Sequence, residues 1–185
     1  MKRIFTILCA AVLTLSVSAQ AQFGVKAGLN SSTIVTTDDV ADGARLAMQI
    51  GGVATIPFGD VVQLRTGVMY SQKGASDGDG DVIALDYLEM PADFSFMIGG
   101  GGFALSAGPY LGLLMSATAD GDDISDLFNG IDMGVNLGAS YTIAESMIID
   151  ARYGMGLTNV DDDDDEIILN GCLSVSFSYM FGSGY

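Results

Sequence analysis

The sequence of 185 residues contains no histidine and no tryptophan. Without histidine the chain cannot assemble a Ser-His-Asp triad, a Cys-His dyad or a His-ligated zinc site. Basic residues are also scarce, because 7 Lys and Arg stand against 23 Asp and Glu, for a formal net charge of −16. Such a chain repels nucleic-acid phosphates. We therefore expect neither an enzyme nor a nucleic-acid-binding protein.

Cysteine and proline are rare, with 2 and 3 residues, whereas glycine reaches 25. Cys9 lies in an N-terminal apolar run, which leaves Cys172 alone in the rest of the chain, and one cysteine cannot form an internal disulfide. Hydrophobic residues make up 49% of the chain and charged residues 16%, which excludes a disordered acidic tail. Beyond the first residues the apolar side chains alternate with polar ones, which favours an all-β fold.

The one long apolar run lies at the N-terminus. Two basic residues precede a mostly apolar stretch over 4–17, and the small residues Ala19 and Ala21 follow it. The stretch is shorter than the ~20 residues that a membrane-spanning helix needs, and its exit fits a signal-peptidase site. We expect a cleaved signal peptide over 1–21, export from the cytoplasm, and a single mature domain over 22–185.

Alternation of apolar and polar residues is clearest in the last segment and is repeated in seven others. In the last segment leucine, valine and aromatic residues fall on one face, and mainly serines fall on the other. Most of the segments exceed the ~5 to 6 residues of a typical strand. The eight predicted strands cover 23–31, 44–56, 61–73, 82–97, 103–117, 131–141, 147–158 and 169–181.

The connections between these segments alternate in length. Long polar connections cover 32–43, 74–81, 118–130 and 159–166, and short ones cover 57–60, 99–102 and 144–146. An even number of strands with short turns at one end and longer loops at the other is typical of transmembrane β-barrels, whose apolar face meets lipid. The sequence predicts an all-β protein, an eight-stranded antiparallel up-and-down barrel in the outer membrane.

Four motifs resemble those of a known family. They are Tyr87-Leu88-Glu89-Met90-Pro91, Ala107-Gly108-Pro109-Tyr110-Leu111-Gly112, Ala151-Arg152-Tyr153-Gly154-Met155-Gly156-Leu157-Thr158-Asn159 and Ser176-Phe177-Ser178-Tyr179-Met180-Phe181. In this order they resemble the PorT-like outer-membrane β-barrel family of Gram-negative bacteria, over essentially the whole mature chain. The resemblance implies an eight-stranded barrel inserted by the barrel-assembly machinery, with no known activity for most members. The chain departs from the family at Asp93, where an apolar residue is usual, and at 182–185, which leaves open which C-terminal aromatic the machinery recognises.

Inward-facing ionisable residues define a candidate site in the lumen. The predicted network comprises Lys26, Arg45, Arg65, Glu89, Asp93, Asp132, Asp150 and Arg152, and Lys73 has the same inward parity. Side chains just fill an eight-stranded barrel, and buried charges must be paired, so we expect a polar plug that closes the lumen. A selective pore or a carboxylate-based active site is the alternative. A turn centred near Asp77-Gly78 would place Arg65 opposite Glu89 and predicts an ion pair between them.

The long loops are acidic and contain no basic residue. Their carboxylates are Asp38, Asp39, Asp42, Asp77, Asp79, Asp81, Asp120, Asp122, Asp123, Asp126 and Asp161 through Glu166. Asp77, Asp79 and Asp81 alternate with glycine as calcium ligands do, although the distal glutamate of a complete calcium loop is missing. We expect no cofactor beyond loosely bound Ca²⁺ or Mg²⁺. The expected partners are outer-membrane lipid, lipopolysaccharide bridged by cations, and basic molecules.

Three rival functions remain at this stage. A secreted lipocalin-like barrel would bind a small apolar ligand inside, and it requires the aromatic face to point inward with Arg45, Arg65, Asp132 and Arg152 outside. An accessory role in a protein secretion system is the second. An outer-membrane hydrolase ranks last, because no nucleophile-base pair can be assembled without histidine.

Overall fold

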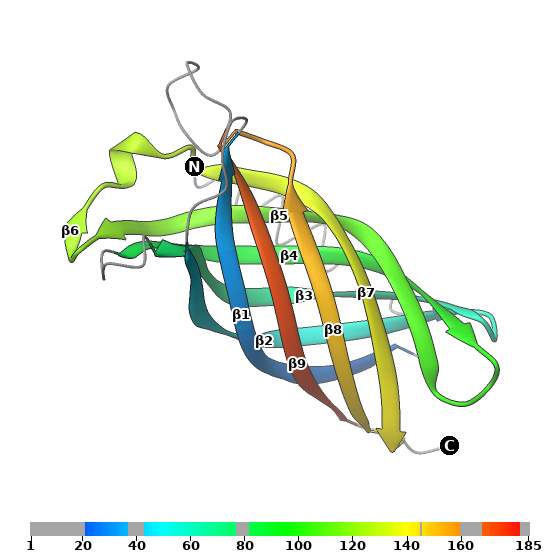
Figure 1. The fold of residues 1–185 in the computed structure, drawn as a ribbon. Helices are drawn as coiled ribbons and strands as arrows, with labels where there is room; N and C mark the ends of the chain where they lie inside the picture. Colours follow the sequence, from blue (N-terminus) through cyan, green and yellow to red (C-terminus); the bar gives the residue numbers. More distant parts are fainter. Residues whose placement is uncertain (1–20, 37–42, 77–81, 145, 160–167, 182–185) are drawn as a thin grey trace, which may run out of the picture.

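The computed structural model describes residues 21–36, 43–76, 82–144, 146–159 and 168–181. The predicted signal peptide, apart from Ala21, lies outside these residues. Eight long strands form a barrel (Figure 1). They are β1 (Gln22–Thr36), β2 (Gly43–Phe58), β3 (Val62–Ser76), β4 (Val82–Ile98), β5 (Phe103–Ala119), β7 (Ile131–Ala144), β8 (Met147–Gly156) and β9 (Ile168–Phe181). The connection between β5 and β7 adds a two-residue strand, β6 (Asp122–Asp123), and a short 3-10 helix, η1 (Ser125–Leu127).

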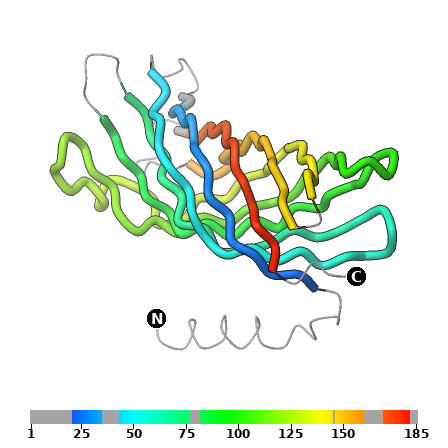
Figure 2. Tube along the Cα trace, turned by 90° about the horizontal axis from the view of Figure 1, so that it is seen from below, coloured from blue at the N-terminus to red at the C-terminus, as the bar shows by residue number. Residues whose placement is uncertain are grey.

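The long strands pair antiparallel around a closed wall. Their order is β4-β3-β2-β1-β9-β8-β7-β5, and pairing of β4 with β5 completes the circle. The first and last strands lie side by side, as Figure 2 shows in blue and red, in a register that runs from Phe23↔Phe181 to Thr36↔Ile168. The predicted eight-stranded antiparallel barrel is therefore confirmed. The boundaries lie within three residues of those expected from alternation, except that β1 continues five residues past the predicted end at 31.

Side-chain exposure alternates along the wall as the sequence pattern predicts. In β9, Leu173 and Phe177 are 50% and 43% exposed, whereas Ser174 and Ser178 are 5% and 1% exposed. The large aliphatic and aromatic side chains thus face outward, where lipid takes the place of water, and the polar ones line the lumen. This is the reverse of the inward aromatic face that a lipocalin-like barrel requires.

The two ends of the barrel differ. The β2–β3, β4–β5 and β7–β8 connections are short, and the chain enters at β1 and leaves at β9 on this same end. In the β4–β5 turn Gly99 and Gly100 have φ of 70° and 66°, a conformation that side chains beyond glycine rarely adopt. No helix among the described residues is long and apolar enough to cross a bilayer.

An apolar cluster lies inside the barrel near the long connections, which the alternation did not lead us to expect. Leu85, Tyr87 and Ala117 are fully buried there. The pairing of β4 with β5 shifts register after Asp86, and this irregularity interrupts the alternation of β5 just before the buried Ala117. Four partly buried residues pack against the cluster, two of them from the β5–β7 connection: Ile83, Leu114, Ile124 and Phe128. The β5–β7 connection is therefore anchored to the lumen by apolar contacts.

Candidate functional site: the charged lumen

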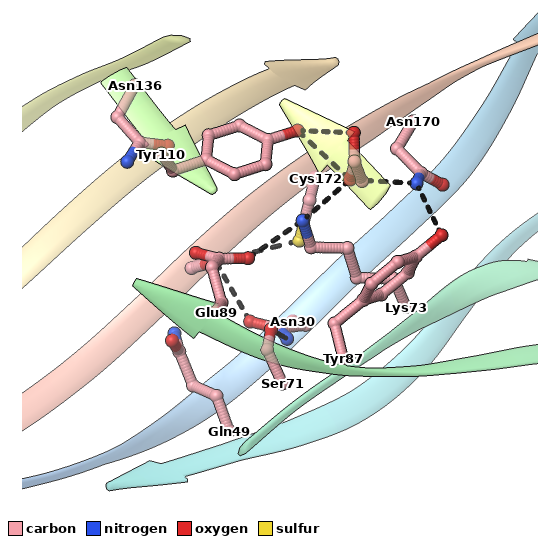
Figure 3. A network of polar contacts seen from close by, with 12 residues as sticks. Asn30, Gln49, Ser71, Lys73, Tyr87, Glu89, Tyr110, Asn136, Asn170 and Cys172 are labelled. Atoms are coloured by element: carbon pink, nitrogen blue, oxygen red, sulfur yellow. Dashed lines mark hydrogen bonds and ion pairs between the residues drawn. The ribbon is translucent and has the colours of Figure 1, made fainter. Parts of the chain in front are cut away.

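Lys73 of β3 lies inside the lumen, in contact with residues of β4, β5 and β7. Its Nζ atom lies 2.8 Å from Oε2 of Glu89 on β4 and 3.4 Å from Oδ2 of Asp132 on β7, and all three side chains are at most 5% exposed. The ring of Tyr110 faces the same ammonium group at 4.4 Å from its centroid (Figure 3). Lys73 thus has two carboxylates and an aromatic ring as partners, which offset the desolvation of its charge.

Neutral groups complete the environment of Asp132. The hydroxyl of Tyr110 donates to both carboxylate oxygens, at 3.3 and 3.2 Å. The amide of Asn170 donates to Oδ2 at 3.0 Å and also to the hydroxyl of Tyr87 at 3.3 Å. Asp132 therefore accepts hydrogen bonds from β5 and β9 while it pairs with β3, and the layer joins opposite sides of the wall.

Arg152 of β8 forms a second layer toward the short turns. Its Nη1 lies 3.2 Å from Oδ2 of Asp93, and its Nη2 lies 3.5 Å from Oε1 of Glu89. Nη2 also donates to Oε1 of Gln49 at 3.4 Å, and the amide of Asn136 donates to Asp93 at 3.1 Å. Because Glu89 pairs with both Lys73 and Arg152, the two layers form one network across the lumen.

A third pair lies closest to the short turns. Nζ of Lys26 is 2.6 Å from Oδ1 of Asp150, and both side chains are at most 10% exposed. Asp150 follows the start of β8 by only a few residues, and Lys26 is similarly placed in β1. This pair closes the ladder of charges on the short-turn side.

The predicted network is found in the lumen, with two differences. Six of the eight predicted residues are buried and ion-paired, namely Lys26, Glu89, Asp93, Asp132, Asp150 and Arg152. Arg45 is only partly buried and donates to the carbonyl of Lys73, not to a carboxylate. Arg65 is partly buried as well and forms no close ion pair with a described residue.

The predicted ion pair between Arg65 and Glu89 is wrong. Arg65 lies opposite Asp93 on the neighbouring strand, and Glu89 lies opposite Met69. Ser76 pairs with Val82, so the midpoint of the connection falls later than the assumed Asp77-Gly78. Glu89 and Asp93 nevertheless both face the lumen as predicted, because the partner of Arg65 is displaced by an even number of residues along β4.

The predicted network did not include Lys73, and it did not include the neutral polar side chains that lie among the charged residues of the lumen. These are Asn30, Gln49, Tyr87, Tyr110, Asn136 and Asn170. Their inward parity was a usable signal, since each falls on the polar face of its strand. Several of their contacts run across the lumen between strands that are not neighbours in the wall, as when Asn170 of β9 donates to the hydroxyl of Tyr87 of β4 at 3.3 Å, and alternation carries no information about such contacts.

Two small cavities lie in the lumen among the described side chains. One of about 30 Å³ lies toward the short turns, and another of about 10 Å³ lies beside Lys73, Glu89 and Cys172. Such volumes hold about two water molecules and one water molecule respectively. Arg152 lines both cavities and separates them. The arrangement is that of a filled interior with hydrated gaps.

The acidic loops are described in part. Asp77, Asp79 and Asp81, the candidate calcium ligands, lie outside the described residues. In the β5–β7 connection the four carboxylates are exposed: Asp120, Asp122, Asp123 and Asp126. Ser125 donates to Asp123 from its backbone N–H at 3.0 Å and from its hydroxyl at 2.7 Å, which holds the pKa of that carboxyl below its usual value. No three of the described Asp, Glu and Cys side chains are grouped so as to hold a metal ion.

Comparison with known proteins agrees with this architecture. Residues 16–162 match the family described as "Outer membrane protein beta-barrel domain". Among solved structures, Neisserial surface protein A is similar, with a TM-score of 0.63 at 20% identity over 87% of this chain and 99% of that one. Ail, the attachment invasion locus protein of Yersinia pestis, has a TM-score of 0.55 at 14% identity over the same shares of the two chains. No curated protein matches the chain.

Proposed function

The chain belongs to the outer-membrane β-barrel domain family, and from this premise we propose that it is a closed barrel that displays acidic loops at the cell surface. In this proposal the barrel has a structural and adhesive role and does not conduct solutes. The observation that carries the proposal is the shared carboxylate of Glu89, which ties the Lys73 and Arg152 layers into one network across the lumen.

The ion-paired side chains that fill the lumen should stay in place and block the passage of ions. Each ion of the network is buried, so moving one away from its partners leaves the other uncompensated, at a cost of several kcal/mol (about 3–5). The apolar cluster of Leu85, Tyr87 and Ala117 lies beyond the network toward the long connections. A solute would have to displace both.

The exposed carboxylates of the β5–β7 connection support a role in binding cationic partners at the cell surface. The β5–β7 connection carries four exposed carboxylates and no basic residue. Ail is known in complex with the heparin analogue sucrose octasulfate, an anion. The β5–β7 connection of the present chain is itself anionic and would repel such a ligand, so the partners we propose are divalent cations, cation-bridged lipopolysaccharide and basic molecules.

Conductance across a planar bilayer tests the closed lumen. The purified barrel should give no stepwise current at moderate voltage, in contrast to a porin measured in the same bilayer. Reproducible ion-selective steps from the wild-type barrel would contradict the closed-lumen part of the proposal.

Binding of a fluorescent polylysine to proteoliposomes tests the surface role. A variant with Asp120, Asp122, Asp123 and Asp126 all changed to Asn should bind less polycation than wild type at low salt. Asp60→Asn is the matched control, because Asp60 is also exposed but lies in the short β2–β3 turn at the opposite end. Equal binding by all three proteins would contradict a role for the β5–β7 connection.

Bound divalent cations form part of the same proposal. Adjacent loop carboxylates repel, and Ca²⁺ or Mg²⁺ would relieve that repulsion. Chelation should therefore accelerate proteolysis in the loops and leave the barrel fragment intact. An unchanged cleavage rate in chelator would remove the cations from the proposal.

The narrower PorT-like placement and the cleaved signal also belong to the proposal. Several motif residues that carry the resemblance, including Glu89, Tyr110 and Arg152, build the lumen network. We therefore infer that the shared motifs serve barrel construction and imply no secretion role. A deletion strain should secrete its proteins normally, and N-terminal sequencing of the mature protein should begin at Gln22. A secretion defect would favour the accessory role instead.

A further inference from the structure

The cavity of about 30 Å³ near the short turns is lined by more positive than negative charge. Its charged residues are the cations Lys26, Arg65 and Arg152 and the carboxylates Asp93 and Asp150. All of them lie within a few residues of one another along the wall, in the half of the barrel that contains the starts of β1, β3 and β8. The cavity is therefore the cationic part of a lumen whose centre is rich in carboxylates.

The two carboxylates are already engaged by two of the cations. Asp150 pairs with Lys26 at 2.6 Å, and Asp93 pairs with Arg152 at 3.2 Å. Arg65 also lines the cavity, and Asp150 and Asp93 attract its charge, but it forms neither a close ion pair nor a side-chain hydrogen bond with any residue that the structure describes. A guanidinium group carries five N–H donors in a fixed plane, and those of the partly buried Arg65 have no acceptor among the described residues, so an anion in the cavity could accept from them.

The rest of the lining suits a small anion. The hydroxyls of Thr55, Ser106 and Ser178 come from three different strands and add O–H donors to the cationic groups. The volume corresponds to about two water molecules, which suits a monoatomic anion better than a larger organic one such as gluconate. Asp150 keeps its second oxygen, Oδ2, without a hydrogen bond to the described residues, so part of the cavity remains suited to water.

We propose that Arg65, with Lys26 and Arg152 beside it, forms a binding site for a small monovalent anion of the size of chloride. The site lies on the short-turn side of the Arg152 layer and is independent of the acidic loops at the other end. The anion supplies the missing negative charge of the cavity, and its binding stabilises the folded barrel in proportion to its concentration.

The test is the urea unfolding midpoint of the detergent-folded barrel, followed as the gel shift between unboiled and unfolded forms. Sodium chloride is exchanged for sodium gluconate at constant ionic strength, so that screening is unchanged. The wild-type midpoint should rise with chloride and level off. Arg65→Gln should lose the chloride-dependent rise. Arg45→Gln is the matched control, because Arg45 is also a partly buried lumen arginine but donates to the carbonyl of Lys73 at the other end.

Line broadening of chloride in ³⁵Cl NMR gives a second readout on wild-type protein alone, should Arg65→Gln fail to fold. Asp150→Asn should strengthen the chloride response, since it removes a competing negative charge. An equal midpoint in chloride and gluconate, with no line broadening above that of Arg65→Gln or of detergent alone, would overturn the proposal. Arg65 would then have Asp150 as its counter-ion in solution.

Discussion

Aspartate occurs in two contrasting settings in this barrel, the lumen and the β5–β7 connection. Asp132 has no exposed surface and accepts hydrogen bonds from Tyr110 and Asn170 while it pairs with Lys73. Asp122, by contrast, is exposed and belongs to a run of carboxylates without a basic neighbour in sequence. In the lumen, hydrogen bonds and an ion pair fix the aspartate side chain, whereas on the β5–β7 connection the aspartate is accessible to cations from solution.

The contrast separates construction from recognition. Charges in the lumen are nearly balanced and hold the strands together, so changes there act on stability. Charges on the connection have one sign and act on solvent, ions and partners, so changes there act on binding. Four predictions test this division, from the largest expected effect to the smallest.

Replacement of Lys73 by Met should destabilise the barrel most. The change leaves Asp132 without its cation and Glu89 with only Arg152, and breaking a buried pair in this way costs about 3–5 kcal/mol. The urea midpoint of the detergent-folded barrel measures it. Lys73→Arg retains the charge and should lose less, whereas a Lys73→Met barrel as stable as wild type would end the argument that the network holds the wall.

The matched pair Asp132→Asn and Asp122→Asn compares the two regions directly. In the lumen the new amide group opposes the donors of Tyr110 and Asn170, and we expect a loss of about 1–3 kcal/mol. On the connection the same change should alter the unfolding free energy by less than about 0.5 kcal/mol. Equal losses in the two variants would erase the distinction between the regions.

Phe128→Ser should loosen the β5–β7 connection and leave the barrel unchanged. Phe128 packs against the buried cluster of Leu85, Tyr87 and Ala117, and the loss of a half-buried side chain costs about 1 kcal/mol. Proteinase K should then cut the connection about fivefold faster, since cleavage follows the open population. Leu127→Ser is the control, because Leu127 is 59% exposed and its loss should leave the cleavage rate unchanged.

Acidification should have the smallest effect, confined to the turn of Asp123 and Ser125. The hydrogen bonds from Ser125 lower the pKa of Asp123, so their stabilisation is present above the ordinary aspartate pKa and is lost as pH falls through the lowered one. A carboxyl NMR titration should show the Asp123 pKa rising toward its usual value in Ser125→Ala. An identical titration in both proteins would remove Ser125 as the cause.

The sequence predicts the strands of this barrel and their inward faces better than it predicts the side-chain contacts inside the lumen. Alternation alone assigned Asp132 and Arg152 to the lumen, because the period of a strand allows only two faces. The same rule could not identify Lys73 as the shared cation. Its partners come from β4 and β7, and which side chains meet across a lumen depends on strand stagger and rotamers, which the pattern of one strand does not contain.

The two errors have local causes. The predicted Arg65–Glu89 pair was wrong because the composition of the connection after Ser76 does not fix its midpoint. In an antiparallel pair, an error in the midpoint changes the residue number of the predicted partner by twice that error. The burial of Ala117 was missed because a register shift between β4 and β5 interrupts the alternation of β5. Leu85 and Tyr87 follow the inward parity of Glu89, but their parity does not show that they meet Ala117 inside the barrel. A break of alternation at Leu113-Leu114-Met115 was the available signal.

The pairing of β1 with β9 also governs how the protein is made. The residues that close the wall come from opposite ends of the chain, so a growing polypeptide has no complete sheet until Phe181 is available. Hydrocarbon offers no hydrogen bonds to open strand edges, so a chain that lacks β9 would present two unsatisfied edges to the bilayer. Closure of the wall is therefore all or none, and a chain that stops short of β9 should not form a stable barrel in a bilayer.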